Sequence, residues 1–513
     1  MKRHFAFLGA ALILIGCQSL PPEGSTTPGS SAPHLYEAVF STYLGGEGGE
    51  FAFGVAADDR ERVYVTGYTH SPDFPVKNGY QMEKKDGESV FVTVFDSAGQ
   101  SLLWSTFIGG ATGGSEGFTV QVDSAYGVYV NGATTASDFP TANAYQAYHP
   151  GAWDSFALKL SSTGSTLLYS TFLGGNNDDW AYKSSLDSEG SFYFACKALS
   201  PDFPTVNPYQ GAFSHSWDAY VVKLSPSGSA LVFSTYLGTT NPDIGEMALA
   251  RGDKVYVIGN TGGGDFPVRD AYQPVKAGAE DAFITVLSAS GSAVLYSTFL
   301  GGSGHETGRA LEVDRDGEIY ATGACGSDDF PLVNPYLSVR RSGDSWVSKL
   351  TSSGSALVFS TLLGGSSSDT SKHICIDDEK NVYVPGHTNS PDFPTVDPFQ
   401  AFHSKHYDGF LSVLSSTGSF LLFSTYLGGS AKDEHYAAWA SGKGTAYISG
   451  QTSSLDFPTL NAFQPAFGGV SDGYVARFRR VPAAPPAAAV APANRLPQPS
   501  DPTDPPDPSD PAE

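Results

Sequence analysis

The heptapeptide FSTYLGG occupies residues 40–46 and returns unchanged at residues 423–429. Five variants lie between the two copies: WSTFIGG from Trp104, YSTFLGG from Tyr169, FSTYLGT from Phe233, YSTFLGG from Tyr296 and FSTLLGG from Phe359. Successive copies are 63 to 65 residues apart. A repeat of this length indicates tandem structural units that share one continuous core.

Two further markers recur in each unit. The tripeptide DFP follows a short β-prone run such as VYVTG (63–67), and an acidic residue opens a second β-prone run such as DAFITVL from Asp281. Runs of β-branched and aromatic residues between Gly-containing turns predict strands and hairpins, and no stretch keeps the 3.6-residue period of a helix. Each unit therefore predicts four short strands, and tandem four-stranded units predict an all-β fold of the β-propeller type.

The order of the repeats predicts how such a propeller closes. The chain begins with a lone outermost strand (35–46) and ends with a lone third strand (472–479), so the last unit lacks a strand that the first residues supply. We expect these two segments to pair and to complete a single seven-bladed β-propeller of four-stranded blades, because closure removes exposed strand edges. The aromatic residue before each Ser-Thr pair predicts a buried packing slot between blades.

Taken together, the motifs STYLGG, SPDFPT and DAF resemble the bacterial β-propeller repeat family called SBBP over residues 35–480. The resemblance implies a seven-bladed propeller in an exported or cell-surface protein. It implies no reaction, and it supplies no catalytic residues.

The N-terminus has the pattern of an export signal. Two basic residues precede the apolar run FAFLGAALILIG (5–16), which is too short to span a bilayer but long enough for a signal peptide. The stretch LIGC (14–17) resembles a bacterial lipobox, in which cleavage before the cysteine is followed by lipidation. We expect residues 1–16 to be a lipoprotein signal peptide and Cys17 to carry a membrane anchor, with Gln18 favouring the outer membrane.

Composition separates the other segments. Residues 17–34 are rich in Ser, Pro, Gly and Thr and predict a flexible tether, whereas residues 481–513 are rich in Pro, Ala and Asp and predict a disordered tail. The repeats fill residues 35–480 between them. A formal charge of −24 disfavours nucleic acid as a partner, because polyanions repel one another.

Three cysteines, Cys196, Cys325 and Cys375, lie in different repeats at non-equivalent positions. We expect them to be buried free thiols, with a bridge between Cys325 and Cys375 as the alternative.

The two faces of the predicted propeller differ in their loops. Connections between the second and third strands are much longer than the hairpin turns of the opposite face, and they carry the DFP motif. Because loops on a rigid scaffold commonly carry binding residues, the long-loop face is the natural binding surface. The DFP aspartates recur in every unit and therefore predict turn caps rather than ligand contacts.

An acidic residue also stands near the start of each innermost strand, at the predicted channel mouth. These residues are Glu50, Glu116, Asp179, Glu246, Glu306, Asp369 and Glu434. Such a ring of carboxylates could bind a cation, but its spacing varies, and the alternative is hydrogen bonding to nearby backbone N–H groups. The DRDG segment (314–317) begins like a calcium loop but lacks the distal Glu, so we interpret it as a hairpin turn.

Aromatic residues that differ between blades are the stronger candidates for ligand contact, because repeated positions hold the ring together. Trp153 and Trp217 directly precede the acid that opens the third strand, and Trp180, Tyr148 and His149 also lie on the predicted long-loop face. Aromatic rings bury a large area at little entropic cost and often anchor interfaces. The alternative is that the two tryptophans pack locally against their own loops.

The sequence contains no nucleophile elbow, phosphate-binding loop or dinucleotide-binding fingerprint, and we expect no cofactor other than a bound cation. We interpret the chain as a membrane-anchored, extracytoplasmic binding or cell-surface structural module. We expect it to be monomeric, with a protein or glycan of the cell envelope as its partner. The alternative is a polysaccharide-acting hydrolase or lyase with loop carboxylates at the channel mouth, since a fold alone selects no function.

Overall fold

The structure, a computed structural model, describes residues 35–85, 87–214 and 216–481. These residues form 29 strands and no helix, which confirms the all-β prediction, and none of their elements is a helix able to cross a membrane. The predicted signal peptide, Cys17, the tether and nearly all of the predicted tail lie outside the described residues. Val481 is the exception, because it ends the last strand.

The strands are short and follow one another with little other regular structure between them. Their bounds are β1 (Leu35–Leu44), β2 (Glu50–Ala57), β3 (Val63–Thr69), β4 (Ser89–Phe95), β5 (Leu102–Ile108), β6 (Ser115–Val122), β7 (Val128–Thr134), β8 (Asp154–Leu160), β9 (Leu167–Leu173), β10 (Asp179–Leu186), β11 (Phe192–Ala198), β12 (Asp218–Leu224), β13 (Leu231–Leu237), β14 (Asp243–Arg251), β15 (Lys254–Thr261), β16 (Asp281–Ser288), β17 (Val294–Leu300), β18 (Glu306–Val313), β19 (Ile319–Cys325), β20 (Asp344–Leu350), β21 (Leu357–Leu363), β22 (Asp369–Ser371), β23 (Cys375–Ile376), β24 (Val382–Thr388), β25 (Asp408–Leu414), β26 (Leu421–Leu427), β27 (Asp433–Ala440), β28 (Thr445–Thr452) and β29 (Asp472–Val481).

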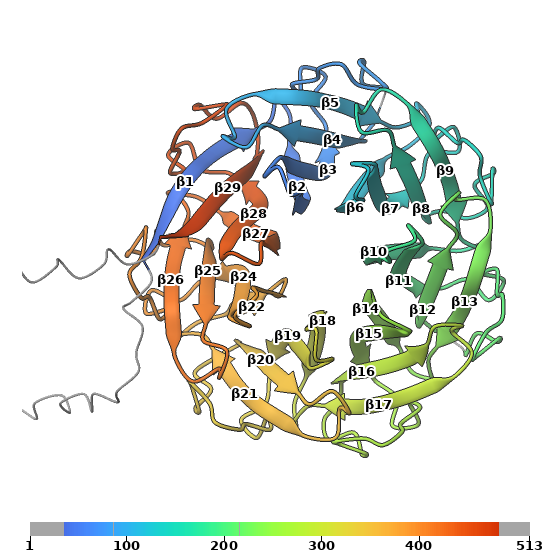
Figure 1. Cartoon of the computed structure of the whole chain (residues 1–513), viewed down its shortest axis with the longest axis vertical. Coiled ribbons are helices and arrows are strands. Elements are labelled where there is room, and N and C mark those ends of the chain that lie inside the picture. The colour runs from blue at the N-terminus through green and yellow to red at the C-terminus, as the bar shows by residue number, and fades with distance from the viewer. Residues whose placement is uncertain (1–34, 86, 215, 482–513) are drawn as a thin grey trace, which may run out of the picture. The chain divides into compact units, whose positions relative to one another are not determined.

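Neighbouring strands pair in antiparallel groups that run outward from a central axis (Figure 1). Strands β2 to β5, β6 to β9 and β18 to β21 form separate four-stranded sheets, and β22 to β26 form a five-stranded sheet. Strands β10 to β17 belong to one eight-stranded sheet, whose two halves are joined by a single parallel bridge between Lys183 and Met247. In each group the first strand lies innermost, as predicted from the hairpin order.

The remaining sheet combines both ends of the described chain. Its order is β1-β29-β28-β27, and β1 pairs antiparallel with β29 in a register that sets Tyr43 opposite Tyr474. Figure 1 shows β1 in blue directly beside β29 in red. A strand that is 35 residues into the chain thus supplies the outer edge of a sheet whose other three strands come from its C-terminal part.

The aromatic residue before each Ser-Thr pair is buried, as the repeat predicted. Exposure is at most 5% for Phe40, Trp104, Tyr169, Phe233, Tyr296, Phe359 and Phe423. Most of these rings pack against a left-handed glycine in the outer hairpin turn of the next sheet: a Cβ on Gly291 (φ 70°) would stand 2.1 Å from the Phe233 ring. Only glycine fits there, because the ring occupies the space of a side chain.

Phe423 differs, because the hairpin turn that would cover it is replaced by the two ends of the chain. Tyr36 of β1 stacks on Phe423 instead, with ring centroids 4.9 Å apart. The first strand therefore substitutes for the missing turn as well as completing the sheet.

The DFP motif has the architectural role that its repetition predicted. Its phenylalanines are almost fully buried, and Phe457, for example, packs 4.5 Å from the Tyr474 ring. The aspartates other than Asp265 accept hydrogen bonds from the backbone of the turn that follows the LGG-type motif; Ser430 N, for example, donates to Asp456 Oδ1 at 2.7 Å. The cysteine prediction is also confirmed, since Cys196, Cys325 and Cys375 are buried free thiols and the alternative bridge is wrong.

Candidate ligand site in the central channel

The innermost strands share an irregularity that directs one side chain of each toward the central axis. Pairing between the first and second strands of each group slips after the third residue, as between Ala52 and Gly54 in β2 and between Gly308 and Ala310 in β18. A bulge of this kind leaves an extra residue unpaired and re-aims its side chain. The residues at this position, which we call the bulge ring, are Phe53, Phe118, Tyr182, Glu246, Arg309, Lys372 and Tyr436.

In one group the irregularity is larger. Residues 372–374 separate β22 from β23, where the other groups have one continuous strand. The neighbouring strand β24 carries Pro385, which has no N–H for the ladder, and only the Lys372 N–H donates to its carbonyl oxygen at 3.0 Å. The break leaves Lys372 and His373 beside the channel rather than in a regular strand.

All members of the bulge ring line one cavity of about 270 Å³, which we call the mouth cavity. Glu116, Trp180 and Lys183 complete its wall. A larger hollow of about 580 Å³ shares Phe53, Phe118 and Lys183 with it and extends along the same strands toward Trp439. The two cavities therefore adjoin along the innermost strands.

The mouth cavity has an aromatic half formed by neighbouring strands β27, β2, β6 and β10. Phe53 contacts both Tyr436 and Phe118 edge-to-face, with centroids 4.8 and 5.5 Å apart. Phe118 in turn stacks on Trp180 at 6.2 Å, and Trp180 contacts Trp153 at 4.4 Å. An unbroken series of rings therefore runs from the bulge ring to the loop that carries Trp153.

The opposite half is charged and comes from β14, β18 and the segment after β22, together with Lys183 of β10. Arg309 Nη1 lies 2.5 Å from Glu246 Oε1, and Lys183 Nζ lies 4.0 Å from Glu246 Oε2. Lys183 also donates to the Arg309 carbonyl oxygen at 3.1 Å. Within the described residues no hydrogen bond or ion pair reaches the Lys372 ammonium, and the Arg309 Nε–H is buried without an acceptor.

Burial changes the acid–base properties of this cavity. Desolvation, reinforced by the nearby charges of Arg309 and Lys183, lowers the pKa of Lys372 to about 8. Desolvation and the neighbouring Glu88 raise the pKa of Glu116 to about 7. Both shifts have the sign expected for charged groups removed from water without a close partner.

The structure divides the aromatic residues that the sequence singled out. Trp180 lines the mouth cavity, and Trp153 contacts Trp180 with a ring-centroid distance of 4.4 Å. Trp217 is not among the residues that line the cavity, and Lys197 Nζ lies 3.8 Å from its ring centre. Tyr148 is 70% exposed in its long loop. Phe402, at the corresponding place in another long loop, is 84% exposed.

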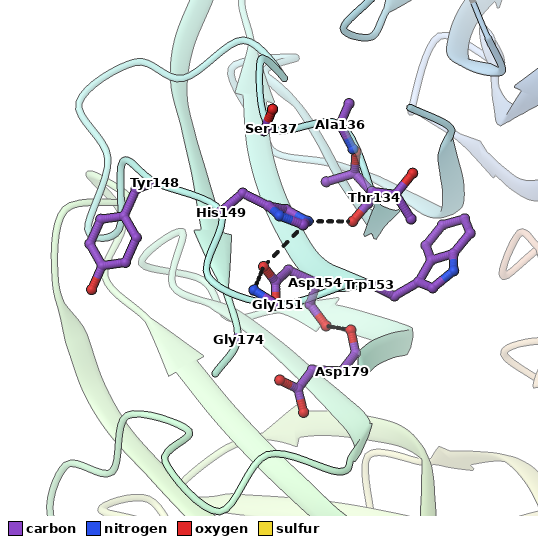
Figure 2. A network of polar contacts seen from close by, with 12 residues as sticks. Thr134, Ala136, Ser137, Tyr148, His149, Gly151, Trp153, Asp154, Gly174 and Asp179 are labelled. Carbon is purple, nitrogen blue, oxygen red and sulfur yellow. Dashed lines mark hydrogen bonds and ion pairs between the residues drawn. The ribbon is translucent and has the colours of Figure 1, made fainter. Parts of the chain in front are cut away.

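His149 has a structural role in the same loop. Figure 2 shows its ring turned inward, between the Thr134 carbonyl oxygen at 3.0 Å and Asp154 Oδ2 at 3.4 Å, while Tyr148 points away. His403 makes the equivalent contact with the Thr388 carbonyl oxygen at 3.3 Å. These histidines hold the long loop against the second strand and leave little surface for a ligand.

The predicted carboxylate ring is not one ring. Glu50, Asp179, Glu306 and Asp369 are first residues of innermost strands, fully buried, and each accepts the backbone N–H of the residue four positions earlier, as Gly46 N does to Glu50 at 3.0 Å. Glu116 and Glu434 stand one residue further along, and Glu246 belongs to the bulge ring. Varying strand register hid this difference from the sequence.

In the part of the chain that the structure describes, one cluster of acids has the spacing of a metal site: Asp314, Asp316 and Glu318. It is a hairpin turn, as the sequence analysis interpreted it. Lys380 Nζ lies 2.8, 2.6 and 3.1 Å from the three carboxylates, so an ammonium group already compensates their charge.

Most of the bulge ring was not predicted from the sequence, although a signal was present. Each member is the third residue after the start of its strand, and this position varies among aromatic, basic and acidic residues while the preceding position is mostly small. Variation at a repeated position was the criterion that selected the tryptophans, and it applies equally here.

Comparison with known proteins identifies the class. A family model described as a β-propeller repeat, SBBP, matches residues 39–75 and 358–394, which cover the LGG turn and the DFP motif of two units. With the ring of outward-running sheets, this defines a β-propeller protein. Two of its repeats match the SBBP model, so the resemblance drawn from the sequence motifs is confirmed at these two places.

Similar solved structures are distant. Quinohemoprotein alcohol dehydrogenase from Comamonas testosteroni is 11% identical (TM-score 0.41; 88% of this chain and 77% of that chain covered). The Dos1 propeller is 10% identical (TM-score 0.41; 86% and 95%), and BamB from Moraxella catarrhalis is 11% identical (TM-score 0.35; 87% and 100%). Likenesses this weak assign no function. No curated protein is similar to the chain in sequence.

Proposed function

We propose that this chain is an exported, lipid-anchored binding protein whose ligand occupies the mouth of the channel through a single, closed seven-bladed β-propeller. The blade number is supported by the seven LGG-type repeats, and closure by the pairing of β1 with β29. Export and anchoring are supported by the signal-peptide pattern of residues 1–16 and by Cys17, with residues 17–34 as tether and 482–513 as tail. The partner is a protein or glycan of the cell envelope.

The bulge ring is the observation that carries this proposal. Seven equivalent backbone positions point at one cavity, yet their side chains are not equivalent: neighbouring members on one half are aromatic and those on the other half are charged. Packing alone would favour the same residue in each blade, as it does in the aromatic slots. A cavity with a few convergent polar groups and an apolar wall is the usual form of a ligand site.

A glycan array with full-length protein extracted from membranes tests the proposal, using Trp180→Ala and the matched control Trp217→Ala. Both variants lose an indole, but only Trp180 lines the mouth cavity. We expect a bound glycan to be lost by Trp180→Ala and kept by Trp217→Ala. The opposite pattern would move the site to the outer loops, and the absence of any bound glycan or protein would contradict a binding function.

A polysaccharide-acting enzyme is the second candidate, and Glu116 is the observation that favours it. A carboxyl group whose pKa is raised to about 7 can act as a general acid near neutral pH, and this one lines the same cavity. The test is release of reducing ends from a bound polysaccharide. Activity that Glu116→Gln abolishes without loss of binding would establish the enzyme, and binding without product release would exclude it.

A further inference from the structure

We propose that the mouth cavity binds a carboxylate carried on a ring, such as an acidic sugar, with the ring against the aromatic half and the carboxylate at Lys372 and Arg309. This inference rests on the proposed function, because it names the chemical class of the ligand for the same site. It follows from two features of the cavity wall, its charge and its aromatic surface.

The charge of the cavity wall is the first feature. Lys183, Arg309 and Lys372 outnumber the carboxylates Glu116 and Glu246 in a chain whose formal charge is −24. Only Glu246 is close enough to pair with any of them, and it already binds Arg309. Glu246 therefore compensates only part of the positive charge, and the excess on this partly desolvated wall favours an anion.

The position of these cations shows where an anion would bind. Lys372 has no ion-pair or hydrogen-bond partner among the described residues, and it shares the cavity with Arg309, whose buried Nε–H has no acceptor. Two neighbouring donors of this kind suit a carboxylate, because guanidinium and ammonium groups form strong charge-assisted hydrogen bonds with its two oxygens.

The aromatic half is the second feature, and it separates this site from a simple anion site. Rings of Tyr436, Phe53, Phe118 and Trp180 form a continuous wall across the cavity from the cations. Such a wall buries the apolar face of a sugar or of an aromatic ring. A cavity of about 270 Å³ suits a small ligand or one terminal unit of a polymer, and Trp153 continues the wall toward the mouth for a following unit.

The experiment measures the binding of small probes to the full-length protein by isothermal titration calorimetry. Glucuronate combines a sugar ring with a carboxylate, methyl glucoside has the ring alone, and acetate has the carboxylate alone. 4-Hydroxybenzoate replaces the sugar by an aromatic ring and so distinguishes the two possible sources of the ring. We expect one or both ring carboxylates to bind at least about tenfold more tightly than methyl glucoside and acetate, with affinity falling as salt rises from 50 to 500 mM.

Matched variants locate the anion. Lys372→Met should weaken binding of the ring carboxylate by about tenfold to a hundredfold, the usual effect of losing a charge-assisted hydrogen bond, and Lys372→Arg should retain most of the affinity. Arg251→Met is the control, because it removes the same charge from the larger hollow at the other end of β14. If Lys372→Met fails to fold, Arg309→Met replaces it in the same comparison.

Failure of this inference can be told apart from failure of the proposed function. Equal binding of methyl glucoside and glucuronate, lost in Trp180→Ala but unchanged in Lys372→Met, would keep the channel site and overturn the anionic ligand. Loss of binding in Arg251→Met but not in Lys372→Met would also overturn it. No binding of any probe, together with an empty glycan array, would reject both.

Discussion

The substitution Asp472→Asn should make the protein more stable at pH 8. Asp472 opens β29, and Glu50 opens the neighbouring innermost strand β2; both are fully buried. One oxygen of each carboxyl group lies 2.5 Å from the point where a Cβ on Gly45 would stand, and Asp472 Oδ1 has no hydrogen-bond partner among the described residues. Two carboxyl groups this close in a buried site share a proton, because charging both is costly.

Other interfaces between sheets repeat the arrangement, which supports its physical origin. Asp344 with Asp369 and Asp408 with Asp433 meet beside Gly364 and Gly428 in the same way. At one interface Ser89 and Ser115 open the corresponding strands, and the two acids, Glu88 and Glu116, each stand one residue away. They remain close enough for the charge of Glu88 to raise the pKa of Glu116.

The pKa of Asp472 sets the size and sign of the effect. Burial, with a smaller contribution from Glu50, raises this pKa from 3.8 to about 7. Each pKa unit corresponds to about 1.4 kcal/mol, so a difference of roughly 4 kcal/mol develops between the two states. Because the folded protein holds a proton that the unfolded chain has lost, stability falls as pH rises from about 4 to about 7. Asparagine has nearly the same shape as a protonated aspartic acid but does not ionise, so Asp472→Asn should remove this loss of stability.

Urea unfolding followed by circular dichroism at pH 5 and pH 8 provides the measurement. The free energy of unfolding of Asp472→Asn, relative to wild type, should rise by about 2 to 3 kcal/mol between pH 5 and pH 8, because part of the total of roughly 4 kcal/mol is already lost below pH 5. The control is Asp456→Asn. Hydrogen bonds from Ser430 lower the pKa of Asp456, so the charged carboxylate stabilises the folded protein and this variant should be less stable than wild type at pH 8. The shared-proton explanation is refuted if Asp472→Asn shows the same pH slope as wild type or is less stable at pH 8.

Three further predictions concern the ring and its anchor. Deleting residues 35–46 should lower the free energy of unfolding by roughly 5 kcal/mol or more, because it removes buried Phe40 and Tyr43 and exposes the edge of β29. Deleting residues 482–513 should leave the melting temperature unchanged. Equal melting temperatures of the two truncated proteins would contradict closure through β1. In chemical denaturation, Gly291→Ala should destabilise the protein by several kcal/mol more than Gly252→Ala. Both glycines have positive φ, but a Cβ on Gly291 would meet the Phe233 ring, whereas nothing lies within 4 Å of a Cβ on Gly252. Equal losses of stability would mean that backbone strain, and not the Phe233 contact, requires glycine. Radiolabelled palmitate should enter the wild-type chain in cells and not Cys17→Ala, and equal labelling would reject the lipid anchor.

The sequence by itself predicted the features that depend on local patterns. Strand positions, hairpin order, the aromatic slots and the capping role of DFP follow from residue alternation, turn residues and strict spacing, which repeat many times in one chain. The relation of β1 to β29 could also be expected, because counting strands shows that one unit lacks its last strand. The predicted start of the tail, residue 481, differs from the structure by one residue, because Val481 still belongs to β29.

Only the tertiary structure decided which side chains meet in the channel. A slip of one residue moves a side chain from one face of a strand to the other, and a bulge depends on the partner strand as well as on the local sequence. Asp243 and Glu246 are both acids near the start of β14 and cannot be told apart from the sequence. Glu246 lines the mouth cavity, whereas Asp243 is fully buried outside it. Trp180 and Lys372 share that cavity although 191 residues lie between them in the sequence, because the sheets are arranged around one axis and their innermost strands meet there.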